Sequence, residues 1–125
     1  MLVALTIYGD PQFLSALSPE LRPAWASRMS RLLTPTGHLI CIEFPTYKDP
    51  ASGGPPWALP PVVYEQHLAR PGEEIPYDDV GNVIVVKEAA GRGNELTLER
   101  IAHWMPERTH EVGKGTDWVS IWQHR

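Results

Sequence analysis

Two continuous apolar segments, separated by one amphipathic segment, constrain the fold of this chain more than any other feature. Residues 2–8 (LVALTIY) and 38–44 (HLICIEF) are short runs rich in β-branched and aliphatic side chains. Runs of this kind are typical of strands that are buried on both faces. A strand, a helix and a second such strand, in that order, form a right-handed unit with parallel strands. The sequence therefore predicts an α/β fold.

The segment between these strands carries the signals of a helix that packs on a sheet. Ser18 offers an oxygen to free amides, Pro19 suits the first helical position, and Glu20 favours the positive end of the helix dipole. Pro23 removes one backbone hydrogen bond unless residues 19–22 form a separate tight turn. The predicted buried stripe follows helical spacing and consists of Leu21, Trp25, Met29, Leu32 and Leu33.

The second half of the chain adds a helix and a terminal pair of strands. A short helical pattern covers residues 61–68, while residues 97–104 (TLERIAHW) and 117–124 (DWVSIWQH) read as strands. The sequence GKGTD at residues 113–117 is a turn between them, so the two segments are predicted to pair antiparallel. The apolar run VIVV at residues 83–86 fits either a short strand or a hydrophobic patch.

Charge and composition exclude several kinds of partner and site. The chain has 125 residues, enough for one domain, and a net charge of −4 without a basic stripe, so no nucleic-acid partner is expected. Cys41 is the sole cysteine, which excludes an internal disulfide and a cysteine-based metal site. The five histidines form no helical pair with an accompanying acid, so no metal site is expected.

The sequence also lacks the features of a membrane protein. It contains no run of about 18 consecutive apolar residues, the length that spans a bilayer as a helix. The N-terminal apolar stretch is short and has no basic region before it, unlike a signal peptide. We therefore expect a cytoplasmic protein without a membrane partner.

A long, stiff and aromatic segment follows the second predicted strand. Residues 45–61 (PTYKDPASGGPPWALPP) exceed the usual connection of about 4 to 6 residues. In an open α/β sheet, ligands bind in the crevice outside the carboxyl ends of the strands, and prolines lower the cost of ordering a loop there. The residues expected to converge on one pocket are Asp10, Phe13, Pro45, Tyr47 and Trp57. The alternative is that the aromatic side chains simply cover the edge of the sheet.

Four blocks of the sequence resemble the C-terminal half of fungal thiol methyltransferases, which are relatives of thiopurine S-methyltransferase and of the plant halide/thiol methyltransferases. They are DPQFLSALSPELRPAWASRM (10–29), LICIEFPTY (39–47), GGPPWALPPVVYEQHL (53–68) and ERTHEVGKGTDWVSIW (107–122). The resemblance covers nearly the whole chain after about Ile7. It implies methyl transfer from S-adenosylmethionine (SAM) to a small thiol, halide or hydroxyl acceptor. It also implies that the chain is the C-terminal part of a Rossmann-like class I methyltransferase sheet.

The resemblance further implies a set of site residues. Asp10 matches the family position near the transferred methyl group, where it could orient or deprotonate a thiol, although an aspartate before proline is also an ordinary turn residue. Pro11 stands where the thiopurine branch has an arginine, so deprotonation assisted by arginine does not carry over. The implied substrate-binding residues are Phe13, Tyr47, Pro55, Pro56 and Trp57. Plain core packing is the alternative for the aromatic members of this set.

Two motifs of the family are absent from these 125 residues. One is the E-x-G-x-G-x-G turn that approaches the cofactor, and the other is the carboxylate that holds the ribose. The sequence GRGN at residues 91–94 follows alanines rather than a strand, so it is not a cofactor loop. Residues 1–125 are thus expected to be a truncated, acceptor-side domain that on its own binds SAM weakly or not at all and does not methylate small thiols or iodide.

Two hypotheses follow from this expectation. In the first, the chain belongs to an enzyme whose cofactor-binding half comes from a partner chain or from an upstream exon. In the second, it is a non-catalytic truncated paralogue that acts as an interaction module, or a degenerate fragment. In either case the strand at residues 2–8 is expected to have a free edge, so a homodimer or a partner chain is predicted to join there.

Overall fold

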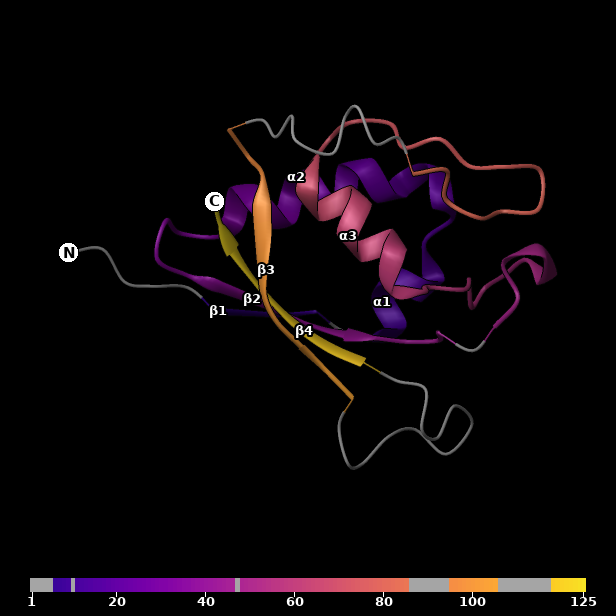
Figure 1. The fold of residues 1–125 in the computed structure, drawn as a ribbon, viewed down its shortest axis with the longest axis horizontal. Coiled ribbons are helices and arrows are strands. Elements are labelled where there is room, and N and C mark those ends of the chain that lie inside the picture. The colour runs from indigo at the N-terminus through magenta and orange to yellow at the C-terminus, as the bar shows by residue number, and fades with distance from the viewer. Residues whose placement is uncertain (1–5, 10, 47, 86–94, 106–117) are drawn as a thin grey trace.

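The computed structural model describes residues 6–9, 11–46, 48–85, 95–105 and 118–125, and for residues 6–9 and 11–13 it describes the backbone alone. Within these residues one sheet holds four strands in the order β1-β2-β4-β3 (Figure 1). The strands are β1 (Thr6–Gly9), β2 (His38–Glu43), β3 (Leu98–Trp104) and β4 (Trp118–His124). The last strand in the chain thus lies between two earlier ones.

Strand pairing agrees with the sequence-based prediction over the described residues. β1 and β2 are parallel, with Gly9 opposite Cys41. β4 is antiparallel to both of its neighbours, with Ser120 opposite Cys41 in β2 and opposite His103 in β3. The fold is therefore mixed α/β, and the predicted terminal antiparallel pair is confirmed.

Helices cover one face of this sheet. The α-helices are α1 (Pro11–Ala16), α2 (Arg22–Leu32) and α3 (Pro61–Ala69), and the 3-10 turns are η1 (Pro19–Leu21) and η2 (Pro50–Ser52). Figure 1 shows α2 and α3 side by side on the same side of the strands. The helix α1 was not predicted. The separate tight turn allowed for by Pro23 is confirmed as η1.

The buried face of α2 differs from the predicted stripe by a rotation of about one residue. Leu21 and Leu32 are 48% and 49% exposed, so the prediction that they are buried was wrong. Leu21 lies in η1 rather than in the helix, which removes it from the helical register. The face turned inward contains Arg22, Ala26 and Ser30 together with Trp25. Small side chains there allow α2 to approach its neighbours closely, and the Ser30 hydroxyl donates to the Leu96 carbonyl over 2.5 Å.

The core lies between this face of α2, helix α3 and the sheet. Trp25 meets Tyr64 of α3 edge to face, with ring centroids 6.1 Å apart. Cys41 is buried, as predicted. The buried core cluster consists of Leu14, Trp25, Ala26, Leu33, Leu39, Cys41, Leu59, Val63, Tyr64, Leu68, Leu98 and Trp122. Burial of this continuous apolar set is what holds the helices to the sheet.

The segment after α3 forms a loop with little regular structure. Tyr77 and Val83 make one antiparallel bridge, and the side chains of Ile84 and Val85 are exposed. The run VIVV was predicted to be either a short strand or a hydrophobic patch. Its described residues, 83–85, form a hydrophobic patch with a single bridge. Residues 91–94 and 113–117 lie outside the described residues. No helix in the described ranges is long and apolar enough to cross a membrane.

Candidate functional site

The segments that follow β1 and β2 start at the same edge of the sheet. The two strands are parallel and in register, so Gly9 and Glu43 end at neighbouring positions of the carboxyl edge. The chain then continues into α1 after β1, and into the long proline-rich loop after β2. This edge is where an open α/β sheet binds ligands.

The long loop is held by hydrogen bonds within itself and by a main-chain hydrogen bond to α1. The Trp57 amide donates to the Ser15 carbonyl over 2.7 Å, and the Leu59 amide donates to the Pro45 carbonyl over 2.8 Å. The Lys48 ammonium donates to the Pro56 carbonyl. Because Ser15 belongs to α1, the first of these bonds ties the loop after β2 to the helix after β1. The loop is thus anchored beside the carboxyl edge of the sheet.

The predicted site residues are placed as follows. Asp10 and Tyr47 lie outside the described residues, and Phe13 belongs to α1, of which the backbone alone is described at that position. Pro55 and Pro56 are exposed on the loop and do not line the pocket described below. Trp57 is half-buried and does line it. The structure therefore brings Trp57, of this set, to a cavity.

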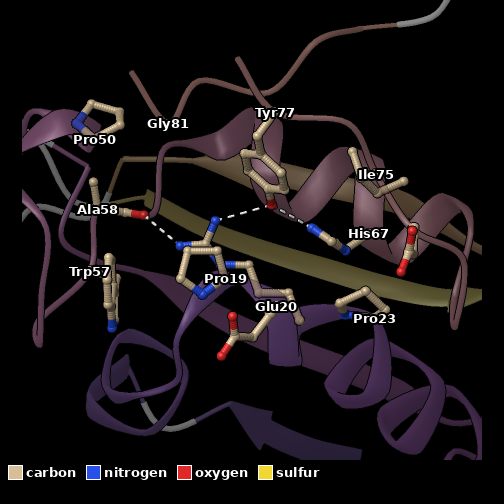
Figure 2. Close-up of a pocket in the computed structure, with 12 residues that line it drawn as sticks. Pro19, Glu20, Pro23, Pro50, Trp57, Ala58, His67, Ile75, Tyr77 and Gly81 are labelled. Carbon is tan, nitrogen blue, oxygen red and sulfur yellow. Dashed lines mark hydrogen bonds between the residues drawn. The ribbon is translucent and has the colours of Figure 1, made fainter. Parts of the chain in front are cut away.

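A pocket of about 420 Å³ opens between the start of α2, the long loop, α3 and the loop after α3. Its apolar lining includes Pro19, Pro23, Pro50, Trp57 and Ile75. Figure 2 shows Trp57 and Ile75 at opposite ends of the pocket, with Tyr77 and His67 between them. The volume and the mainly apolar walls are typical of a site for a small organic ligand.

A connected set of polar side chains crosses this pocket. Arg22 donates from one terminal nitrogen to the Tyr77 hydroxyl and from the other to the Ala58 carbonyl, both over 3.1 Å. The Tyr77 hydroxyl and His67 Nε2 are 2.6 Å apart. Arginine has no acceptor atom, so the Tyr77 hydroxyl is free to donate its own hydrogen to Nε2. That assignment puts the ring hydrogen of His67 on Nδ1, which has no partner among the described residues.

His67 is neutral in this setting. Burial lowers its pKa to about 4, and the positive charges of Arg22 and Arg70 act in the same direction. The side chain is almost fully buried, at 1% exposure. Near neutral pH the pocket therefore contains a neutral imidazole beside a charged guanidinium.

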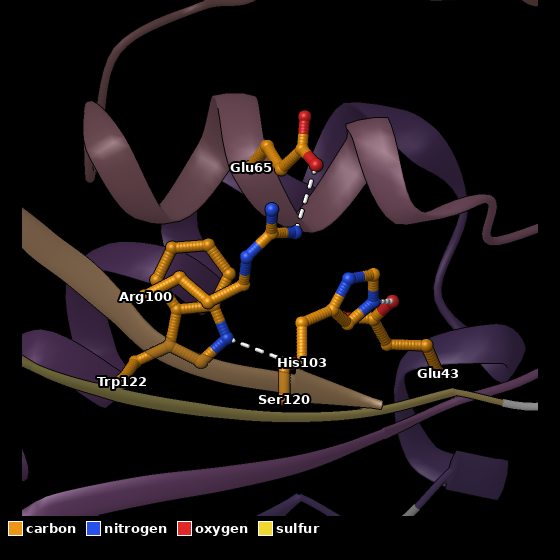
Figure 3. Close-up of polar contacts among 6 residues, drawn as sticks. All are labelled: Glu43, Glu65, Arg100, His103, Ser120 and Trp122. Atoms are coloured by element: carbon orange, nitrogen blue, oxygen red, sulfur yellow. Dashed lines mark hydrogen bonds and ion pairs between the residues drawn. The ribbon is translucent and has the colours of Figure 1, made fainter. Parts of the chain in front are cut away.

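A second polar cluster lies on the helix-covered face of the sheet, at the end of β2. Glu43 is fully buried, and its Oε1 lies 3.0 Å from Nε2 of His103 on β3. The His103 ring stacks on Trp118 with centroids 4.5 Å apart. Figure 3 shows the Glu43–His103 contact beneath α3, where Arg100 of β3 pairs with Glu65 over 2.8 Å. Polar side-chain contacts therefore join β2, β3 and α3.

Burial dominates the acid–base properties of this cluster. It raises the pKa of Glu43, while hydrogen bonds with Ser120 and His103 act in the opposite direction. Burial also raises the pKa of Cys41, and the charge of Glu43 adds to that effect. The Cys41 thiol is thus held in its neutral form and is not a nucleophile here.

Sequence reasoning did not find Arg22, His67, Tyr77 or the Glu43–His103 pair. Glu43 could have been noticed as an acid within the mainly apolar run HLICIEF. A buried carboxylate needs a partner, so its position predicts a nearby polar or charged group. No comparable local signal exists for Arg22. Its partners, Ala58 and Tyr77, lie 36 and 55 residues away in the chain.

The described residues do not form a metal site or a dinucleotide-type cradle. Over this part of the chain no three His, Cys, Asp or Glu side chains gather closely enough to hold a metal ion. The glycines with positive φ within it are Gly53, Gly72 and Gly81, and each lies in a loop rather than directly after a strand. A phosphate- or ribose-binding turn needs the latter position. The described residues therefore do not fit the nucleoside part of SAM.

Comparison with known proteins identifies relatives of the chain. "Probable thiol methyltransferase 2" of Arabidopsis thaliana is 34% identical over 100 residues, which cover 80% of this chain and 40% of that protein. "Thiocyanate methyltransferase 1" of Brassica oleracea is 41% identical over 68 residues, which cover 50% of this chain and 29% of that protein. The chain thus spans less than half the length of these curated relatives. Residues 3–109 match the family Thiopurine S-methyltransferase (TPMT), to which this chain belongs.

Proposed function

We propose that the chain supplies the acceptor side of a SAM-dependent methyltransferase that acts on a small thiol, halide, thiocyanate or hydroxyl compound. The observation that carries this proposal is the pocket beside Trp57, formed by the segments that follow two parallel strands in a chain matching the family over residues 3–109. Methyltransferases of this family generally use SAM. Two relatives bear the names of thiol and thiocyanate methyltransferases, which supports a small sulfur acceptor.

The fold supports the same proposal at the level of the sheet. A parallel pair, β1 and β2, followed by an antiparallel pair at the end of the chain, fits the C-terminal part of a Rossmann-like class I methyltransferase. In that arrangement the acceptor approaches from the carboxyl edge. Trp57 and the ordered loop then shield the acceptor from water.

The chemistry requires a deprotonated or anionic acceptor and a methyl group held in line with it. SAM supplies that methyl group when bound. The residues of this chain contribute the position of the acceptor, and rate depends strongly on such positioning. Asp10, at the end of β1, remains the predicted group for orienting or deprotonating a thiol.

A complementation experiment tests the proposed function. Transfer of a labelled methyl group from SAM is measured for the 125-residue chain alone and fused behind a segment of a relative that carries the E-x-G-x-G-x-G turn. The acceptors are a small thiol, thiocyanate and iodide. We expect transfer by the fusion and none by the chain alone. Absence of transfer by a folded, SAM-binding fusion would refute the proposal.

Matched variants of the fusion test the role of the pocket. Trp57→Ala is expected to lower kcat/KM by about tenfold, equivalent to about 1.4 kcal/mol of transition-state binding. Leu32→Ala serves as the control, because its side chain is half exposed on the outer face of α2, away from the pocket. Equal loss in both variants would mean that Trp57 acts through stability alone.

A second candidate function is that of a non-catalytic interaction module. The edge of β1 that faces away from β2 favours it, because no strand in the described residues pairs there. Under this alternative the fusion binds SAM but transfers no methyl group, while association through β1 persists.

A further inference from the structure

Among the described residues, Arg22 is a buried cation without a counter-ion. Its side chain lines the pocket, yet the residue is only 3% exposed. In the described part of the chain no carboxylate lies within ion-pair distance of it, and its two hydrogen bonds go to neutral oxygens of Ala58 and Tyr77. Its Nε is buried without a hydrogen-bond partner. Holding a charge in this way is costly unless something else compensates it.

The described groups around Arg22 leave its charge uncompensated. His67 is neutral near neutral pH, because burial and the nearby positive charges lower its pKa to about 4. Arg70 adds to the positive potential at His67 rather than cancelling it. Two acids, Glu20 and Glu74, also line the pocket, but both are exposed to solvent. The pocket thus has a positive floor and two negative groups at its rim.

We propose that this pocket binds a small organic carboxylate, with the carboxylate directed to Arg22 and the apolar body against Trp57 and the pocket's prolines. A carboxylate matches the planar fork of a guanidinium better than other monoanions do. A single uncompensated cation favours a ligand with one negative charge. The volume of about 420 Å³ and the apolar walls leave room for an organic body beside the charged group. This carboxylate site uses the same pocket as the proposed function, but it does not depend on methyl transfer, because carboxylate binding needs no methyl donor.

A direct binding measurement tests this proposal. The 125-residue chain is titrated with benzoate and with benzamide, its neutral isostere, by isothermal calorimetry and by following amide shifts in NMR spectra. We expect benzoate to bind at least about tenfold more tightly, which corresponds to about 1.4 kcal/mol. Equal affinities for the two compounds would overturn the proposal.

Two variants separate the charge of Arg22 from its structural role. Arg22→Gln is expected to weaken benzoate binding to the level of benzamide, while Arg28→Gln, an exposed position on the same helix and outside the pocket lining, leaves it unchanged. Circular dichroism checks that each variant is folded. A folded Arg22→Gln chain that binds benzoate like the wild type would contradict the proposal.

The rim supplies a test that does not disturb the buried network. Glu20 is exposed, and its carboxylate accepts only from the Ser18 hydroxyl among its described contacts, so Glu20→Gln keeps the fold. Removing this negative charge should tighten benzoate binding by about two- to threefold at low salt and leave benzamide binding unchanged. If Arg22→Gln fails to fold, the Glu20→Gln titration tests the proposal instead. Unchanged benzoate affinity in Glu20→Gln would refute an anion site. The methyl-transfer assay is separate, so failure of either proposal leaves the other intact.

Discussion

Trp25 joins α2 to α3 through an aromatic contact with Tyr64. Its ring is 7% exposed and meets Tyr64 edge to face, at an interplanar angle of 86°. We expect Trp25→Ala to lower the free energy of unfolding by about 3 to 5 kcal/mol, because the cavity left behind cannot close fully. Urea titration measures the loss. Leu32→Ala, on the exposed side of the same helix, is the control, and a loss below about 1 kcal/mol at Trp25 would show that its ring is not buried.

His67 makes stability depend on pH with a defined sign. Its pKa falls from 6.5 in the unfolded chain to about 4 in the folded one, so the unfolded chain binds more protons between these values. The stabilisation is therefore complete above pH 6.5 and is lost as the pH falls towards 4, by about 3 kcal/mol at most. Comparing urea titrations of the wild type and His67→Gln across this window isolates the effect. An NMR titration midpoint of the His67 ring near 6.5 would contradict it.

Some helices and strands could be predicted from local sequence patterns, and other features of the fold could not. The strands, α3 and the terminal pair were predicted because their apolar runs and turn residues lie within each segment. The inward face of α2 was predicted in part, since Trp25 and Leu33 are buried. Arg22 was missed because its partners, Ala58 and Tyr77, lie in distant parts of the chain. Contacts between distant parts of the chain also explain why most of the candidate site was missed. Trp57 could be predicted from the aromatic loop, whereas the Arg22–Tyr77–His67 network forms only once three separate segments meet.

The long loop has one position with no room for a side chain. A Cβ on Gly54 would lie 2.6 Å from Cγ and Cδ2 of Trp57, and these atoms belong to the base of the indole ring. Gly54→Ala should therefore displace the whole ring and destabilise the chain by about 1 to 3 kcal/mol. The Trp57 indole signal in NMR spectra and a urea titration measure the two effects. Ala51→Ser, at an exposed position in the same loop, is the control. An unmoved indole signal would contradict this packing.

The two outer strands of the described sheet differ in how well they resist pairing. β3 carries Glu99 and Arg100 and has an irregular register between Arg100 and Ala102, both of which discourage association. The described part of β1, TIYG, has no charge. We therefore expect the chain to associate through β1, and Thr6→Lys to weaken that association. Ile101→Lys on β3 is the control. Sedimentation of the wild type as a monomer at high concentration would refute the prediction.

The described residues combine a well-formed pocket beside Trp57 with no group that fits the nucleoside of SAM. Catalysis of methyl transfer depends on holding both reactants in line, so a site for one reactant alone gives no rate enhancement. The pocket beside Trp57 and the carboxyl edge of β1 and β2 can serve that reaction when a donor-binding segment completes the edge.

Binding of SAM by the 125 residues alone tests this division directly. Close approach of the backbone to the cofactor requires a glycine turn directly after a strand, and ribose binding requires a carboxylate after the next strand. The sequence contains no E-x-G-x-G-x-G turn, and the positive-φ glycines of the described residues lie in other loops. We therefore expect calorimetric titration with SAM to give no saturable heat for the 125-residue chain, and saturable binding for the fusion that carries the turn. Micromolar binding by the chain alone would place a cofactor site within these residues and contradict the division. Circular dichroism of the same sample provides the control for folding.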